Sequence, residues 1–144
     1  MVAMQTGSRC LPASDGWQAT WIDTPEALGD MRKKCRSNFI PAEPATDSDV
    51  DFNRFAVLAV EMGQQATAGY GFDRNGVSAR IEGRVVTVSL GYHRPDPGAM
   101  TAQVVTSPWI MIRLPAGKYE GIRVVDPKGD LLVQLDTTAL LRER

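Results

Sequence analysis

Short runs in which apolar and polar residues alternate dominate the second half of the chain. The clearest run is 85–92, which reads Val-Val-Thr-Val-Ser-Leu-Gly-Tyr. Such alternation predicts a strand with one face turned inward, because successive side chains of a strand point to opposite faces. Further strands of this kind are predicted over 110–114, 122–124 and 131–135.

The segment 55–62 has a different pattern, because it is almost continuously apolar: Phe-Ala-Val-Leu-Ala-Val-Glu-Met. An apolar run of this length predicts a central strand that is buried on both faces. Closely spaced glycine and proline turn signals follow it, and Asn75-Gly76 predicts a type I′ hairpin turn. These patterns together predict an antiparallel β-sandwich or a barrel-like domain.

One amphipathic helix is predicted after a short first strand that starts at Trp17. Thr24 is a good N-cap and Pro25 suits the first helical position, where the missing N–H would have been unpaired. Leu28, Met31 and Cys35 fall on one stripe, so the helix is expected to lie on a sheet. The predicted fold class is therefore mainly β with one amphipathic helix (α+β).

The chain is predicted to hold a single domain over residues 17–144. Residues 1–16 show no periodicity and are expected to form a flexible leader or linker. The polar stretch 38–51 is expected to be a connection, and 137–144 has room for one helical turn.

Charge and hydropathy narrow the classes of partner. Sixteen basic and seventeen acidic residues give a net charge of -1, which disfavours a nucleic-acid partner. We expect no transmembrane segment in this chain, because every apolar run is far shorter than a bilayer requires.

Side chains capable of catalysis or metal binding are sparse, so we expect a protein that is not an enzyme and has no metal or cofactor. The single histidine, His93, is predicted to be a solvated loop residue, since a general base needs a nucleophile and an orienting partner. The acidic stretch 47–51 lacks the later glycine and glutamate of a calcium loop. Cys10 and Cys35 belong to no metal-ligand spacing, and both a disulfide and two ordinary thiols remain open.

The segment 50–115 contains the motifs Asp51-Phe52, Gly63–Tyr70, Pro97–Met100 with Gln103, and Thr106–Trp109. In these motifs it is similar to the C-terminal domain of PrcB, a protein associated with a protease complex. Two departures fall in the first loop, where the family pattern Gly-x-x-Pro-Thr-Gly-Gly-Tyr has Ala66 in place of proline and Ala68 in place of a glycine. Trp109 also replaces the usual tyrosine.

This resemblance implies a non-catalytic module that helps a peptidase complex to stay assembled. It also implies a location in the cell envelope, periplasmic or lipid-anchored, or outside the cell, with a signal peptide absent from this sequence. The expected partner is a protein such as a peptidase, bound through loops 63–70 and 106–109. The expected contact residues are Thr67, Gly69, Tyr70, Thr106, Pro108 and Trp109.

Two alternatives to this interpretation are open. The same loops also resemble those of chagasin-type inhibitors, which would make the protein an inhibitor of cysteine peptidases. The loop residues can instead have a structural role, with Tyr70 packed inside and Trp109 in the core, because large aromatic side chains are usually mostly buried.

Overall fold

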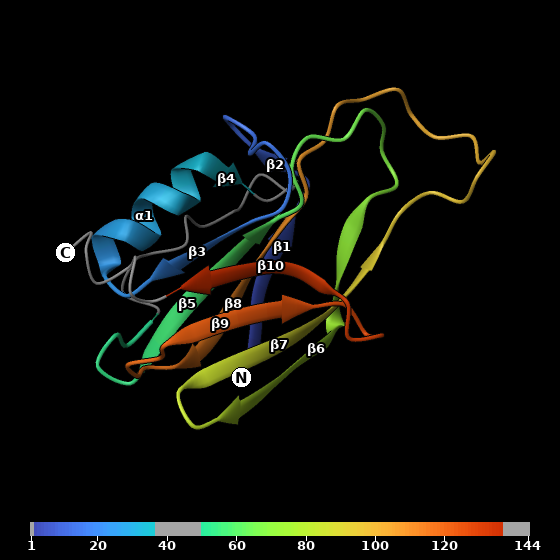
Figure 1. Cartoon of the computed structure of the whole chain (residues 1–144). Helices are drawn as coiled ribbons and strands as arrows, with labels where there is room; N and C mark the ends of the chain where they lie inside the picture. The colour runs from blue at the N-terminus through green and yellow to red at the C-terminus, as the bar shows by residue number, and fades with distance from the viewer. Residues whose placement is uncertain (1, 37–49, 137–144) are drawn as a thin grey trace.

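A computed structural model describes residues 2–36 and 50–136 and arranges them as a helix and two sheets stacked in three layers (Figure 1). The predictions for 38–49 and 137–144 lie outside these described residues. The first sheet is antiparallel, with the strand order β1, β8, β5, β3. Its strands are β1 (Val2–Gly7), β8 (Trp109–Pro115), β5 (Phe55–Glu61) and β3 (Gln18–Ile22).

The second sheet is mixed, because β7 and β9 run parallel while the other neighbours run antiparallel. Its order is β10, β9, β7, β6, with the bounds β6 (Gly71–Glu82), β7 (Val85–His93), β9 (Gly121–Val125) and β10 (Leu131–Asp136). The edges of the two sheets approach each other at β1 and β6 and at β3 and β10, yet they form no ladder among the described strands. The sandwich is therefore the correct one of the two predicted architectures.

The strand β5 is central and buried on both faces, as its continuous apolar pattern predicts. Leu58 and Val60 face the second sheet, whereas Val57 and Ala59 face the helix layer. Alternate residues of β8 divide in the same way. The core between the sheets includes Ala19, Leu58, Val60, Met62, Phe72, Val86, Val88, Leu90, Ile110, Ile112, Leu114, Ile122 and Val124.

The helix α1 (Pro25–Lys34) covers the outer face of the first sheet (Figure 1). Thr24 caps it as predicted, since the Thr24 side chain accepts a 3.1 Å hydrogen bond from the Ala27 N–H. Leu28 and Met31 are buried against the sheet. The helix ends where Cys35 turns extended and begins the two-residue strand β4 (Cys35–Arg36), which pairs with β2 (Arg9–Cys10). No helix in the described part of the chain has the length and apolar character needed to cross a membrane.

The structure departs from two expectations about local structure. Much of the expected leader is ordered, because Val2–Gly7 forms an edge strand and Cys10 is fully buried. The Asn75-Gly76 hairpin prediction is wrong, since β6 continues through it with a bulge. The hairpin turn lies instead at Gly83, which adopts a positive φ of 61°. Short edge strands and bulges depend on partners far away in sequence, so local patterns predict them poorly.

Trp109 lies in the core and not at a rim, with 1% of its surface exposed. Its indole packs so closely on β1 that a Cβ at Gly7 would lie 2.6 Å from its Nε1.

Trp109→Ala should therefore lower the free energy of unfolding by about 3–5 kcal/mol, because the substitution leaves a cavity in the core. Urea denaturation followed by circular dichroism measures the loss. Met100→Ala, at a fully exposed position, is the control and should stay within about 0.5 kcal/mol of the wild type. A similar small effect of Trp109→Ala would contradict the buried placement.

Candidate functional site

Two loops lie side by side beyond one end of the sheets and form the most prominent projection of the molecule (Figure 1). We call them the loop pair: residues 63–70, after β5, and residues 94–108, between β7 and β8. Gln65 and Thr106 exchange two backbone hydrogen bonds of 2.7 and 2.9 Å, and the Ala68 N–H donates to the Ala102 carbonyl at 3.0 Å. The Thr106 hydroxyl adds a 3.1 Å bond to the Thr67 carbonyl. Each loop is thus braced by the other.

The predicted contact residues of the second loop lie at its base and not at its tip. Thr106, Pro108 and Trp109 are all buried. Thr106 bridges to the first loop, and the Pro108 carbonyl accepts a hydrogen bond from the Met62 N–H. These three residues hold the loop in place, and their side chains offer a partner little surface.

The predicted contact residues of the first loop are more accessible, but two of them have evident structural roles. Thr67 and Tyr70 are half-buried, and Tyr70 packs against the core between the sheets. Gly69 is exposed and has a φ of 100°, a conformation that favours glycine. A Cβ at Gly69 would also lie 3.1 Å from Pro95 of the second loop. The structure therefore places Thr67 and Gly69 beside the second loop, and Tyr70 against the core between the sheets.

Three large apolar side chains of the loop pair are exposed, and the sequence analysis did not single them out. Met100 is fully exposed, and Val104 and Val105 are more than half exposed. No charged residue occurs in 63–70 or in 97–108, although charged residues make up 23% of the chain. In the sequence, the only sign of this exposed apolar surface was the pair Val104-Val105 within a turn-rich segment. We call Met100, Val104 and Val105 the apolar tip.

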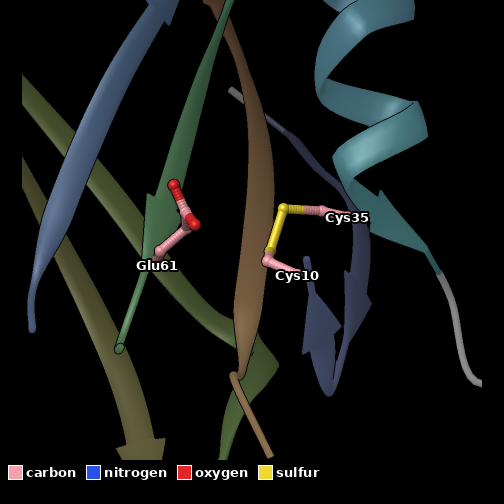
Figure 2. Close-up of side chains that lie close together, drawn as sticks. All are labelled: Cys10, Cys35 and Glu61. Atoms are coloured by element: carbon pink, nitrogen blue, oxygen red, sulfur yellow. A yellow bond between two sulfur atoms is a disulfide. The ribbon is translucent and has the colours of Figure 1, made fainter. Parts of the chain in front are cut away.

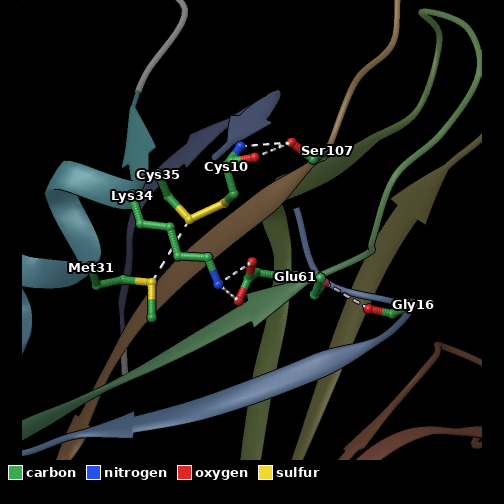
Figure 3. The surroundings of a disulfide bond; sticks show 8 residues. Cys10, Gly16, Met31, Lys34, Cys35, Glu61 and Ser107 are labelled. Carbon is green, nitrogen blue, oxygen red and sulfur yellow. Dashed lines mark hydrogen bonds and ion pairs between the residues drawn. A yellow bond between two sulfur atoms is a disulfide. The ribbon is translucent and has the colours of Figure 1, made fainter. Parts of the chain in front are cut away.

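A second cluster lies at the base of the loop pair, on the helix side of the first sheet. Cys10 and Cys35 face each other across β2 and β4 and form a buried disulfide (Figure 3). The bridge is thus the correct one of the two alternatives left open by the sequence. It closes a loop with a sequence separation of 25 and joins the first residues of the domain to the end of α1.

A buried ion pair lies beside the disulfide. Glu61, at the end of β5, has 1% of its surface exposed. Lys34 Nζ lies 3.1 Å from its Oε1 and donates a 3.2 Å hydrogen bond to its Oε2. The two sulfur atoms and a Glu61 carboxylate oxygen all lie within 4.8 Å of one another (Figure 2). Because these residues come from three distant segments, spacing along the sequence could not reveal the cluster.

Ser107 joins the disulfide to the loop pair. Its hydroxyl accepts a 2.6 Å hydrogen bond from the Cys10 N–H and donates a 3.0 Å bond to the Cys10 carbonyl (Figure 3). Its own N–H donates to the Ser8 carbonyl at 2.8 Å. The base of the second loop is therefore fixed to the cystine-bearing segment by buried hydrogen bonds.

His93 has a carboxylate partner that the sequence did not suggest. Its Nδ1 lies 3.0 Å from Asp73 Oδ1, and both side chains are more than half exposed. A carboxylate can orient an imidazole, but nucleophilic catalysis also needs an aligned nucleophile. The absence of catalytic activity stays a prediction.

One tyrosine outside both clusters has a perturbed pKa. Burial raises the pKa of Tyr119 above its ordinary value of 10.0. Its hydroxyl donates a 2.6 Å hydrogen bond to the Pro115 carbonyl, and its ring meets Trp21 edge-on. Tyr119 thus fastens the loop after β8 to the sandwich.

Comparison with known proteins identifies one family. Residues 56–115 match the family model described as PrcB C-terminal. The matched segment starts in β5, ends with β8 and contains the whole loop pair. The resemblance expected from the sequence is thereby confirmed for this segment. No curated protein and no solved structure matches the chain significantly.

Loss of the disulfide should lower stability substantially. Cys10→Ala/Cys35→Ala is expected to reduce the free energy of unfolding by about 2–4 kcal/mol, because the unfolded chain gains the entropy of the opened loop. Urea titrations with and without a dithiol reductant measure this. The reductant should destabilise the wild type and leave the double variant unchanged. A wild type that is indifferent to complete reduction would contradict the prediction.

The two partners of the ion pair should respond unequally to substitution. Lys34→Met leaves the Glu61 carboxylate buried without its cation and should cost about 3 kcal/mol. Glu61→Leu should cost less, because Lys34, whose side chain is 26% exposed, can turn to water. The double variant Lys34→Met/Glu61→Leu should recover most of the loss, since it removes both charges. Urea denaturation of the wild type, the two single variants and the double variant gives the coupling energy between Lys34 and Glu61. If the losses of the single variants simply add up in the double variant, the prediction is wrong.

Proposed function

We propose that this protein is a non-catalytic protein-binding module that helps a peptidase complex to assemble, and that its partner docks on the apolar tip of the loop pair. The observation that carries the proposal is the exposure of Met100, Val104 and Val105 on a braced projection whose segments 63–70 and 97–108 hold no charged residue. Exposed apolar patches on folded domains are typical of interaction sites.

The bracing of the loop pair favours binding. A loop that is already ordered loses less conformational entropy when a partner immobilises it. Here the cross-loop hydrogen bonds at Gln65 and Ala68 order both loops before any encounter. The burial of Thr106, Pro108 and Trp109 adds a fixed base. The proposed contact surface therefore moves from the base to the tip of the second loop.

The resemblance to the PrcB family supports a peptidase complex as the binding partner. The matched residues 56–115 include the loop pair and, apart from Phe55, the four strands that flank it: β5, β6, β7 and β8. A location in the cell envelope or outside the cell accords with the buried disulfide, because disulfides persist chiefly in oxidising compartments.

Capture experiments test the apolar tip directly. Purified protein serves as bait for envelope and secreted fractions of the source organism, and captured peptidase subunits are identified by mass spectrometry. Val104→Asp/Val105→Asp should reduce their recovery at least about tenfold, because aspartate cannot be buried cheaply in an apolar contact. Salt should affect wild-type capture little, since the tip carries no charge.

Ile81→Asp is the matched control. Ile81 is 48% exposed, close to the 55% of Val104, but it lies on the β6–β7 hairpin at the opposite end of the sandwich (Figure 1). This variant should capture the same subunits as the wild type. Equal capture by the loop variant and the wild type would overturn the assignment of the tip.

The second candidate function is inhibition of a cysteine peptidase, and the side-by-side projection of two loops from one end of a sandwich favours it. A narrow, apolar projection has a shape that can enter a cleft. Inhibition of papain-like peptidases by the wild type, lost in Val104→Asp/Val105→Asp, would support this function. Capture of a peptidase without inhibition would support assembly.

A further inference from the structure

We propose that the reduced protein binds a zinc ion through Cys10, Cys35 and Glu61. The disulfide and the metal would then be alternative ways of holding β2 to β4, and the metal would hold β5 as well. This inference is independent of the loop pair and of its partner. It rests on the geometry, burial and charge of the cluster beside the disulfide.

The three ligands already converge on one point. Their donor atoms lie within 4.8 Å of one another, and the close-up shows the carboxylate turned toward the disulfide (Figure 2). Donor atoms of a tetrahedral zinc site lie roughly 3.5–4 Å apart, given Zn–S and Zn–O bonds of about 2.3 and 2.1 Å. Once the sulfurs are no longer bonded, small side-chain rotations suffice to reach that spacing. All three residues are buried, so water competes weakly for the ion.

The two oxygens of Glu61 are not equivalent. Oε2 accepts the hydrogen bond from Lys34, whereas the buried Oε1 has no partner in hydrogen-bonding geometry among the described residues, although Lys34 Nζ lies 3.1 Å away. A buried acceptor with no hydrogen bond is uncommon in folded proteins. Lys34 thus lies close to both oxygens but donates its hydrogen bond to Oε2, so in the proposed site Oε1 is the ligand and Oε2 keeps the hydrogen bond from Lys34.

Charge balance favours the same assignment. Two thiolates and one carboxylate carry three negative charges, and a divalent zinc ion leaves a net charge of about -1. The Lys34 ammonium, already bound to Glu61, brings the cluster to neutrality. In the disulfide form, Lys34 and Glu61 also cancel. Neither form thus leaves an uncompensated charge under α1, which would be costly there.

The fourth position of a tetrahedral ion has two sources in the structure. Met31 Sδ lies 3.7 Å from Cys35 Sγ and can supply a thioether (Figure 3). Water can also enter beside Lys34, whose side chain is partly exposed.

The redox step balances with a dithiol as the reductant. The dithiol transfers two electrons and two protons to the Cys10–Cys35 bond, forms its own cyclic disulfide and leaves two free thiols. Zinc then binds both sulfurs and the carboxylate, and the two thiol protons pass to solvent. The metal would join β2, β4 and β5, whereas the disulfide joins β2 and β4 alone.

Cobalt spectroscopy tests the proposal. The full chain is reduced in urea with a dithiol, refolded and desalted without oxygen, and its two free thiols are confirmed by mass after alkylation. Titration with Co²⁺ should produce a thiolate-to-cobalt charge-transfer band and the visible bands of a tetrahedral ion. Zn²⁺ should displace the cobalt and remove these bands. The oxidised wild type should show none of them when Co²⁺ is added.

Variants distinguish a metal site formed by Cys10, Cys35 and Glu61 from metal binding by the two free thiols alone. Glu61→Gln should weaken Co²⁺ binding at least about tenfold, and Lys34→Met should weaken it by a similar factor as a positioning residue. Cys35→Ser should abolish the charge-transfer band from a two-thiolate site. Glu120→Gln, at an exposed carboxylate far from the cluster, is the matched control and should bind as the wild type does. Circular dichroism checks that each variant is folded.

Three results would overturn the proposal. The first is reduced, folded wild type without tetrahedral cobalt bands. The second is equal affinity of the wild type and folded Glu61→Gln. The third is a reduced chain that stays unfolded in the presence of zinc, because a metal that replaces the disulfide must restore the fold.

Discussion

The two-sided burial of the first sheet is the constraint on which the rest of the structure depends. Leu58 and Val60 of β5 contact the second sheet, while Val57 and Ala59 contact the layer of α1. A strand in this position exposes neither face, so both flanking layers are needed to keep its apolar area from water. At about 25 cal/mol per Å² this burial is the dominant stabilising contribution. The loop pair is attached to this sheet where β5 ends and where β8 begins.

The same constraint explains the charged cluster. Because Glu61 continues the alternation of β5 on the helix side, its carboxylate is buried under α1. A buried carboxylate requires compensation, and the last turn of α1 supplies Lys34. The next residue, Cys35, is in turn bound to Cys10. Within two residues, the end of the helix therefore supplies a charge that pairs with Glu61 of β5 and a covalent link to Cys10 of β2.

Local patterns predicted the elements that are set by local physics. The Thr24-Pro25 cap, the central apolar strand and the alternating β7 require only side-chain periodicity and capping chemistry, and all three were predicted. The edge strand β1, the bulge in β6 and the burial of Trp109 depend on contacts between residues far apart in sequence, so periodicity could not establish them. The candidate site divided in the same way. The sequence indicated both loops, but it could not show that Thr106–Trp109 are buried and that Met100, Val104 and Val105 are exposed.

Hydrogen bonds connect the loop pair to the disulfide, and they hold the base of the second loop in place. Ser107 makes both of its hydroxyl hydrogen bonds to the backbone of Cys10. Whatever fixes Cys10, whether a disulfide or a metal, thus also fixes the base of the second loop. An apolar projection can remain exposed without collapsing onto its own domain only if its base is rigid. The cross-loop hydrogen bonds at Gln65 and Thr106 supply rigidity along the projection, and Cys10 supplies it at the base. The disulfide beside α1 therefore holds the base of the second loop through Ser107.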